Sequence, residues 1–543
     1  MSKIGLIWRT VRYLRARQIV YQLVNRLRKR PKLRLPKQAP SGHFLAVPAV
    51  DKPVSYRDGT FTFLNQPVLF ASAIDWNYAQ NGKLWTYNLN YFDYLNQASP
   101  GLTAKEGQRL IRGFITHTDS LNDGLEPYPT SLRIINWMQF LSRHQIQDDD
   151  IEIHLFAQID LLNKRLEYHL AGNHLLENGF ALLLGALYFK QKHWFRRASK
   201  LVRQELAIQI LADGAHDERS PMYHQLLLDR LLDVLIALQV NSWHNDASLV
   251  EFLAGISTKM LDWLKAVTFA NGDVPLVNDA AFGIAPTSAQ ILAKAQRLPF
   301  REKSKRAEML ISSLPAGSQT GQDSGYLMYR WPHFELFVDA GAVGPDHQPG
   351  HAHADTFSFV LHVDGKPVIV DSGTSTYQIG PRRTWERSTA AHNTVEISGY
   401  DSSEVWGGFR VGRRAYVTTR RESDVGISAH HDGYTNIGIT HVRAWHTESL
   451  KFSILDRIIG HKSDCETRLS YVARLHFHPD VLVRSYTDHV MAGPIAIRFL
   501  SDTRPKLVLK PYLLADGFNK LRPGHCLEIT FTNYLNTIVT YNE

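Results

Sequence analysis

Cysteines are scarce in this chain, and long uninterrupted apolar segments are absent. Only Cys465 and Cys526 occur among 543 residues, so a disulfide-rich scaffold is excluded, while one bridge or two free thiols both remain open. No run of about 18 apolar residues occurs, so no transmembrane helix is expected. Arginines interrupt the apolar runs near the N-terminus and no small-residue cleavage site follows, which is unlike a cleaved signal peptide. We therefore expect a location in the cytoplasm or peripherally at the inner membrane rather than in the periplasm.

Acidic residues are absent from the first fifty positions, which contain twelve Lys or Arg and no Asp or Glu. The formal net charge of +9 therefore originates largely there, and the rest of the chain is close to neutral. Apolar residues between Ile4 and Leu27 recur at roughly helical spacing among the arginines. Two interpretations stay open: a basic amphipathic helix that contacts a membrane surface, or a helix packed on its own protein. The sequence has no nucleic-acid-binding motif, so a nucleic-acid partner is not expected.

The chain is too long for one ordinary core, and its pattern changes along its length. Residues 1–55 are predicted to form a basic helix and a linker rich in Pro and Lys. In residues 56–315, mostly beyond residue 70, apolar residues recur every three or four positions, which predicts successive antiparallel helices. Residues 316–543 contain short alternating runs bounded by turn residues, which predict an antiparallel β-sandwich. The predicted fold is therefore multidomain, helical first and then β.

The segment GHAHADTFSF contains His351 and His353. If the segment is a strand, both side chains face the same side, because side chains alternate along a strand. Asp371 ends the run VIVDSG, and His392 begins the run AHNTVEIS. Two imidazoles and one carboxylate form a plausible zinc site. The competing interpretation is a strand with two solvent-facing histidines.

Two motifs in the helical part carry candidate polar groups. In AGNHLLENG, Asn173 and His174 precede an apolar helix, and Glu177 lies on the same helix face as His174. Asn173 could instead be a helix N-cap, which is a common role for asparagine. In DERSPMYH, Tyr223 stands just before another long helix, where core packing is the alternative role.

Two further residues, Arg133 and Trp137 in PYPTSLRIINW, are candidates for lining a sugar site. Aromatic rings stack on the C–H faces of pyranoses, and arginine pairs with acidic sugars. Ordinary core packing is the competing interpretation of both side chains.

Together these motifs resemble the heparinase II/III family of polysaccharide lyases, which is also similar to certain alginate and oligoalginate lyases. The resemblance covers roughly residues 70–520 and is strongest in the His-x-His-Ala-Asp segment with its downstream Asp-Ser-Gly and Ala-His-Asn-Thr. It implies an N-terminal (α/α) toroid followed by a C-terminal antiparallel β-sandwich, with the active site between them. An acidic polysaccharide that contains uronic acid is the implied substrate.

The resemblance also implies roles for individual residues. His351 matches the catalytic histidine and Tyr223 the catalytic tyrosine, while Asn173, with His174 or Glu177, matches groups around the substrate carboxyl. One structural zinc is implied, with the ligands His353, Asp371 and His392.

The chemistry of elimination explains why these residue types are needed. A lyase removes the C5 proton of a uronate and expels the oxygen at C4. Donors such as Asn173 or a protonated His174 stabilise the charge that develops on the carboxyl group. We expect Tyr223 to act as the acid and, if nearby cations lower its pKa, also as the base for one epimer, with His351 as base for the other. The zinc is expected to orient His351 rather than to activate water, because elimination needs no water.

Two alternative functions remain open at this point. A glycoside hydrolase on the same toroid would need two carboxylates flanking the bond, for which Glu177 and Asp279 are the candidates. A non-catalytic glycan-binding or assembly protein could retain the fold. Intact Asn173, Tyr223 and His351 argue against a decayed site.

Overall fold

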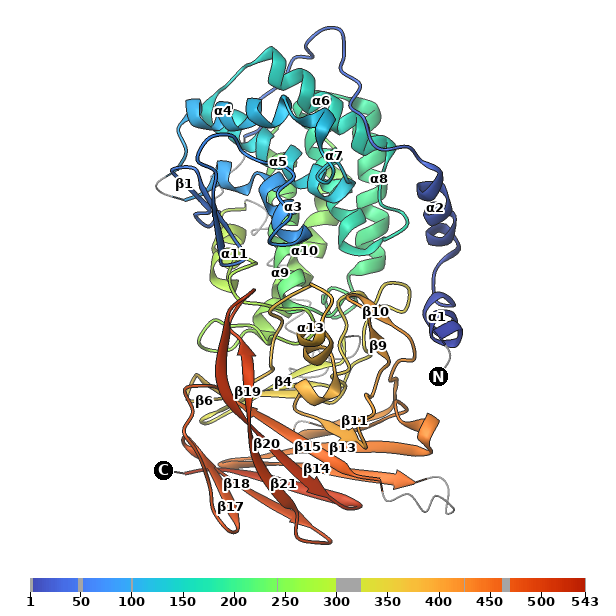
Figure 1. The fold of residues 1–543 in the computed structure, drawn as a ribbon, viewed down its shortest axis with the longest axis vertical. Coiled ribbons are helices and arrows are strands. Elements are labelled where there is room, and N and C mark those ends of the chain that lie inside the picture. The colour runs from blue at the N-terminus through green and yellow to red at the C-terminus, as the bar shows by residue number, and fades with distance from the viewer. Residues whose placement is uncertain are drawn as a thin grey trace.

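The structure is a computed structural model in which a helical region is followed by a region of antiparallel sheets (Figure 1). This order confirms the fold class predicted from the sequence. The predicted boundary near residue 315 falls between described segments, so its position stays a prediction. The structure describes residues 3–46, 52–98, 101–241, 243–298, 324–423, 425–460 and 469–542.

The helical region alternates buried inner helices with half-exposed outer helices, as an (α/α) toroid does. The inner helices are α5 (Pro127–His144), α7 (Gly172–Tyr188) and α9 (Pro221–Val240), whose residues are mostly buried. A helix that is apolar on nearly every side must be surrounded by other elements. The remaining helices are α3 (Lys83–Tyr91), α4 (Ala104–Ile115), α6 (Asp149–Lys164), α8 (Lys192–Gln209), α10 (Ala247–Val267) and α11 (Ser288–Gln296).

The central helix α7 is packed closely by its neighbours at two glycines. A methyl group at Gly179 would lie 2.9 Å from Val202, and one at Gly185 would lie 2.8 Å from Ile159. Both separations are below van der Waals contact, so these glycines let α8 and α6 approach α7. The close packing fixes the start of α7, where Asn173 and His174 lie.

A small sheet precedes the helices of the toroid and was not predicted from the sequence. Its strands β1 (Tyr56–Arg57), β2 (Thr60–Phe63) and β3 (Gln66–Leu69) are antiparallel. Phe61 and Phe63 are buried in the same hydrophobic cluster as the helices. Strands this short give too few alternating positions to stand out against the surrounding loop.

The β region consists of two eight-stranded antiparallel sheets that share one hydrophobic core. Leu336 from one sheet and Ile454 from the other belong to the same buried cluster, so the sheets pack face to face as a sandwich. The first sheet has the order β11 (Val417–Ser423), β12 (Gly426–His431), β13 (Ile439–Glu448), β14 (Lys451–Gly460), β21 (Tyr534–Tyr541), β18 (Ile495–Ser501), β17 (His489–Ala492) and β16 (Val483–Ser485). The second has the order β19 (Lys506–Ala515), β20 (Leu521–Phe531), β15 (Tyr471–Phe477), β7 (Lys366–Ile369), β6 (Phe359–Val363), β5 (Phe334–Asp339) and β4 (Tyr326–Trp331), with β8 (Val395–Ile397) paired to β15.

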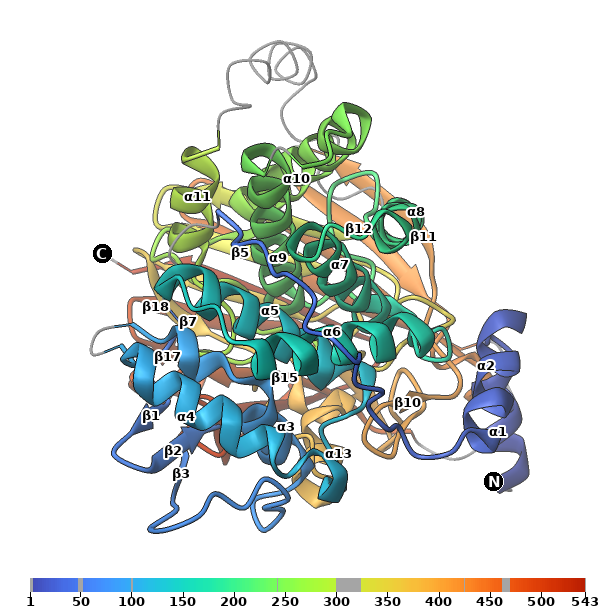
Figure 2. The same cartoon turned by 90° about the horizontal axis from the view of Figure 1, so that it is seen from above.

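The N-terminal segment forms two helices instead of the single helix expected from its spacing. Helices α1 (Lys3–Val11) and α2 (Ala16–Leu27) are separated by a short turn, and residues 28–46 contain neither helix nor strand. Both helices lie at one side of the molecule, beside the junction of the helical and β regions (Figures 1 and 2). Arg9 pairs with Glu404 at 2.6 Å in the β region, and Arg17 pairs with Glu205 at 2.8 Å in α8. The segment therefore bridges both regions.

Two expectations about the chain as a whole concern membranes and disulfides. Among the described helices, none is long and apolar enough to cross a bilayer. Cys526 is buried and forms no disulfide with a described residue. Cys465 lies outside the described residues, so the choice between a bridge and two free thiols stays open.

Candidate active site

His351 and His353 lie in a loop, not on the strand that the sequence predicted. The loop runs from the end of β5 at Asp339 to the start of β6 at Phe359. Its backbone bonds to other loops instead of to a neighbouring strand: the His353 N–H donates to Asn278 Oδ1 at 2.8 Å. Asp371 and His392 likewise follow β7 and precede β8 instead of lying on strands. The predicted shared strand face is therefore wrong, although the polar groups do converge.

Asp279 holds the two histidines apart and orients each of them. Its Oδ2 atom lies 2.9 Å from His351 Nδ1, and its Oδ1 atom lies 3.0 Å from His353 Nε2. Burial opposes ionisation of Asp279, but Arg383 in the short helix α13 (Pro381–Glu386) and the two histidines hold its pKa well below the ordinary value. An ionised carboxylate can only accept, so His351 donates from Nδ1 to Asp279, which fixes the orientation of the ring.

Tyr223 stacks on His351 at the junction of the two regions. It lies in the first turn of α9, where Ser220 caps the helix and Pro221 occupies the first turn. The two ring centres are 3.9 Å apart, and the Tyr223 hydroxyl lies 3.0 Å from the hydroxyl of Tyr377. Burial, with Tyr377 and Asp279 nearby, raises the pKa of Tyr223 well above its ordinary value. The condition for a base role, a pKa lowered by nearby cations, is therefore not met, and the hydroxyl is a proton donor.

Asn173 reaches the same junction through Glu218, a residue that was not selected from the sequence. The Asn173 backbone N–H donates to Glu218 at 2.9 Å, and its side-chain amide donates at 2.7 Å. Glu218 also lies 3.5 Å from His351 Nε2. Helix α7 begins at Gly172, and the side chain of Asn173 caps nothing, so the N-cap interpretation is excluded. Gly172 has φ of +57° and a side chain there would collide with Glu218, so only glycine permits this contact.

His174 and Glu177 follow on α7 but make separate ion pairs. His174 Nδ1 lies 3.3 Å from Glu167, and although burial favours the neutral ring, Glu167 raises the pKa of His174 above its ordinary value. Glu177 accepts a hydrogen bond from Arg230 Nε at 2.8 Å and is largely buried. His174 is therefore paired with Glu167 beside Asn173, and Glu177 is paired with Arg230.

Arg133 and Trp137 do not line a sugar site. Both side chains are fully buried in the helical core. Arg133 donates to Gln158 Oε1 at 2.6 Å and to the Gly124 carbonyl at 2.8 Å, and Trp137 packs its edge against Phe92. Their assignment as substrate-binding residues was wrong, because a spacing that suits a sugar platform also suits an aromatic core.

His353, Asp371 and His392 lie together in the buried interior below His351. His392 Nδ1 is 2.8 Å from Asp371 Oδ2, and the rings of His353 and His392 have centres 5.3 Å apart. His353 Nδ1 and His392 Nε2 are buried and have no hydrogen-bond partner among the described residues. Among the described residues, no group of three or more His, Cys, Asp or Glu side chains is arranged so that it could hold a metal ion.

The donor chemistry of these residues nevertheless suits a zinc ion. Each histidine has one ring nitrogen fixed by a carboxylate and the other left free, which is the usual arrangement of zinc-binding histidines. His353 Nδ1 and His392 Nε2 would hold the ion, because both nitrogens are buried and without a described hydrogen-bond partner. In this structure Asp371 orients His392, and the buried Oδ2 atom of Asp355 is also without a described partner.

Three site residues were missed in the sequence or given another role there. Glu218 lies just before Ser220, in the motif that contains Tyr223. The sequence therefore shows where Glu218 stands in the chain, but not which side chains it contacts. Asp279 was considered only as a hydrolase carboxylate, and Arg383 was given no role in the site. Arg383 is in fact fully buried against Asp279. Asp279 and Arg383 are far apart in the sequence, so no local pattern could have predicted that they pair.

The helical toroid, the two-sheet sandwich and the group formed by Asn173, Tyr223 and His351 at their junction define one class of protein. Residues 129–301 match the family model described as Heparinase II/III N-terminus, and residues 314–535 match the model described as Heparinase II/III-like, C-terminal. The chain belongs to the heparinase II/III-like family.

Several known proteins are similar to this chain. A heparin-sulfate lyase of Bacteroides stercoris is 24% identical over 251 residues, which is 42% of this chain and 36% of that protein, so about a third of the relative's length is matched. A heparan sulfate lyase HepC mutant from Pedobacter heparinus has a TM-score of 0.59 at 16% identity, covering 89% of this chain and 81% of that chain. A heparinase III structure has a TM-score of 0.62 at 15% identity, covering 87% and 80%. These two structures share the fold.

Proposed function

We propose that this protein is a polysaccharide lyase that cleaves an acidic polysaccharide by β-elimination next to a uronic acid. The observation that carries the proposal is the stack of Tyr223 on His351, with Asn173 joined to His351 through Glu218. These groups come from α7, α9 and the loop of the β region between β5 and β6. The names of the similar lyases support the same reaction class.

The two reacting groups are held in a fixed arrangement. Asp279 accepts from His351 Nδ1 and so orients the ring with Nε2 toward Glu218. Tyr223 keeps its proton because burial raises its pKa. His351 is therefore the base that takes the C5 proton, and Tyr223 is the acid that protonates the departing C4 oxygen. The role of Tyr223 as a base for the other epimer requires a phenolate, which this environment disfavours.

Residues at the start of α7 stabilise the negative charge that develops on the uronate carboxyl group. The Asn173 amide has a second N–H beyond the one given to Glu218, and the raised pKa of His174 favours the protonated ring beside it. Preorganised donors of this kind stabilise an enolate-like transition state more than the ground state. Glu218 accepts a hydrogen bond from the Asn173 side-chain amide and holds that amide in place.

The two alternative functions receive less support from the geometry. Hydrolysis needs two carboxylates free to act on the bond. Glu177 is paired with Arg230, and Asp279 is occupied by Arg383 and both histidines. A purely binding or assembly role would not require Tyr223 to stack on His351 with its hydroxyl held by Tyr377.

The lyase proposal is tested with a panel of uronate-containing polysaccharides, including heparan sulfate, alginate and acidic exopolysaccharides. Elimination produces a 4,5-unsaturated uronate that absorbs in the ultraviolet, whereas hydrolysis produces reducing ends without absorbance. We expect absorbance to grow with the unmodified protein and to be lost in His351→Ala. Reducing ends without absorbance would establish hydrolysis instead.

We infer that one structural zinc is held by His353 and His392, with Asp371 as third ligand or as the carboxylate that orients His392. The free buried nitrogens of both histidines support this inference. A bound ion would supply positive charge that fixes the loop carrying His351. The chain's own contribution to the reaction is the orientation of His351 by Asp279, which holds with or without that ion.

We also propose that the protein contacts an anionic membrane surface at the cytoplasmic side of the inner membrane through α1 and α2. Most of the large apolar side chains of both helices are exposed, while Arg9, Arg17 and Gln18 face the protein. Trp8 is 64% exposed and Leu27 is 87% exposed. The outward apolar residues are Ile4, Ile7, Trp8, Val11, Ile19, Val20, Leu23 and Leu27.

The inward contacts explain this orientation. Thr10 accepts a hydrogen bond from the Trp406 indole at 3.0 Å, Tyr13 lies under Arg414 at 3.8 Å, and Gln18 donates to the His347 carbonyl at 3.1 Å. An apolar face flanked by basic residues is suited to the headgroup layer of anionic lipids. Work on an acidic exopolysaccharide at that surface is consistent with this placement.

Vesicle sedimentation tests the membrane proposal. Vesicles containing phosphatidylserine should bind the full chain and phosphatidylcholine vesicles should not. Trp8→Asp and Leu23→Asp should abolish binding, while Leu482→Asp, a change at a 64% exposed apolar residue of the sandwich, should not. Unchanged binding in both N-terminal variants would refute the proposal. Conversion of a dimer to a monomer by Trp8→Asp, without vesicle binding, would show that a second copy covers the face.

A further inference from the structure

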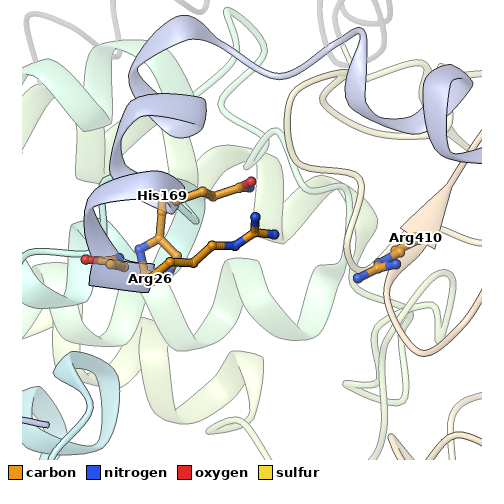
Figure 3. Close-up of a pocket in the computed structure, with 5 residues that line it drawn as sticks. Arg26, His169 and Arg410 are labelled. Carbon is orange, nitrogen blue, oxygen red and sulfur yellow. The ribbon is translucent and has the colours of Figure 1, made fainter. Parts of the chain in front are cut away.

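A polar cavity lies between α2 and the loops that lead to the active site. Its volume is about 430 Å³, and its lining consists of Gln22, Asn25, Arg26, His169 and Arg410 (Figure 3). The first three come from α2, His169 from the segment before α7, and Arg410 from the short strand β10 (Arg410–Val411). A cavity of this size is within the range that accommodates a sugar-sized ligand.

The cavity has positive charge without a built-in counter-ion. Neither Arg26 nor Arg410 forms an ion pair with any residue that the structure describes. The Arg410 guanidinium lies 4.7 Å from the ring centre of Trp406. Two guanidiniums and the side-chain amides of Gln22 and Asn25 form a donor-rich site for an anion.

Both walls of the cavity are continuous in sequence with the catalytic group. His169 precedes Asn173 by four residues, and its imidazole is close enough to His174 and Glu167 for their charges to affect its pKa. Arg410 follows Phe409, whose ring centre lies 6.1 Å from that of His351. The cavity is therefore linked to the catalytic group through residues 169–173 and through Phe409 and Arg410.

Helix α2 is fixed in place on the cavity side. The buried Gln18 amide donates to the carbonyls of Leu170 and His347, and the Tyr21 ring lies 4.8 Å from that of Tyr168. Gln18, Gln22, Asn25 and Arg26 share one face of the helix, so anchoring Gln18 turns the other three toward the cavity. This face is opposite the apolar face of α2.

We propose that this cavity is an accessory subsite that binds an anionic group, sulfate or carboxylate, on a sugar of the polysaccharide outside the bond that is cleaved. The inference rests on the proposed lyase function and adds a determinant of substrate choice. The family models begin at residue 129, so three of the five lining residues lie outside the segments they match. The subsite is thus a feature of this chain's own N-terminal helix, and Arg26 and Arg410 are its principal ligands.

The experiment measures binding and cleavage separately. Dissociation constants are determined by calorimetry for a uronate-containing disaccharide and for a dodecasaccharide, each in a sulfated and an unsulfated form, with the full chain in the Tyr223→Phe background. Arg26→Gln and Arg410→Gln are compared with Arg498→Gln, a control at an exposed arginine of β18. Thermal melting verifies that each variant is folded.

We expect each subsite variant to weaken dodecasaccharide binding about tenfold, since a charge-assisted hydrogen bond is lost, and to leave disaccharide binding and the control unchanged. A loss limited to the sulfated form identifies sulfate as the bound group, and a loss with both forms identifies carboxylate. Dodecasaccharide binding within twofold of the parent in both variants would overturn the subsite.

Two further outcomes distinguish the subsite from the membrane proposal and from the lyase proposal. If Arg410→Gln weakens binding to phosphatidylserine vesicles but not to the dodecasaccharide, the anion is a lipid headgroup and the subsite is refuted. If the unmodified protein yields no unsaturated product while Arg26→Gln and Arg410→Gln still weaken dodecasaccharide binding, the subsite stands and the lyase function fails. Normal cleavage with unaffected dodecasaccharide binding would show the reverse: the lyase function stands and the subsite fails.

Discussion

Replacement of Tyr223 by phenylalanine removes one hydroxyl group and retains the ring that stacks on His351. The hydroxyl has one described partner, the hydroxyl of Tyr377 at 3.0 Å. A neutral hydrogen bond contributes about 0.5–1.5 kcal/mol to stability. In a chain of 543 residues this corresponds to a shift in Tm of about a few degrees at most.

The expected effect of the same change on catalysis is much larger. Loss of a general acid lowers the rate by roughly 10²–10⁴-fold, equivalent to about 3–5.5 kcal/mol of transition-state stabilisation. Tyr223→Phe should therefore reduce kcat far more than it reduces stability. Because the stacked ring remains, KM should change little.

The matched control is Tyr377→Phe. It removes the other partner of the same hydrogen bond but leaves the Tyr223 hydroxyl in place. Initial rates of unsaturated-uronate formation and melting curves are measured for both variants. We expect similar melting temperatures, and a rate loss below about tenfold for Tyr377→Phe. Equal rate losses in the two variants, or a Tyr223→Phe rate within tenfold of the parent, would refute the role of Tyr223 as acid.

Three further changes test other parts of the site. Because Glu167 raises the pKa of His174 above 6.5, kcat/KM should fall as pH rises through that pKa. A pH–rate profile of His174→Gln should lack this fall at alkaline pH. An unchanged profile would contradict the role of His174. Metal analysis should find about one zinc per chain, lost in His353→Ala and retained in the exposed control His333→Ala; full retention in His353→Ala would exclude the proposed ligand set. Arg133→Ala should lower the free energy of unfolding by about 3–5 kcal/mol, measured with denaturant, while KM stays unchanged; a raised KM with normal stability would restore a substrate-binding role.

The order of helices and strands was predictable because their hydrophobic periods differ along the chain. Alternation between residues 325 and 540 predicted the sandwich, and three- and four-residue spacing predicted the inner helices. The strand assignment for His351 and His353 failed for a local reason. Their backbone groups bond to Asn278 and to other loops, and such long-range partners leave no period in the sequence.

The identity of the site residues was more predictable than their partners. Asn173, Tyr223 and His351 do converge, as the motifs suggested. Glu218 and Asp279, which hold these groups in place, could not be assigned because their roles depend on which side chains meet in three dimensions. Burial likewise reversed the expected pKa shift of Tyr223, since sequence neighbours do not reveal how much solvent remains.

The N-terminal helices illustrate what a helical pattern can and cannot predict. The spacing of apolar residues in α1 and α2 predicted amphipathic helices, and it left open which face contacts the protein. Pairing of Arg9 with Glu404 and of Arg17 with Glu205 turns these two arginines inward. The long sequence separation of these pairs is the reason that the membrane interpretation and the packing interpretation could not be distinguished beforehand.

The central claim is elimination at a uronate by His351 and Tyr223, and ultraviolet absorbance of the unsaturated product tests it most directly. The purified full chain is incubated with heparan sulfate, alginate and acidic exopolysaccharides, beside Tyr223→Phe and His351→Ala. We predict absorbance that grows with the unmodified protein on at least one polymer, and a rate that falls at least about a hundredfold in both variants. Absorbance that grows equally in all three proteins, or depolymerisation without absorbance, would contradict elimination by these two residues.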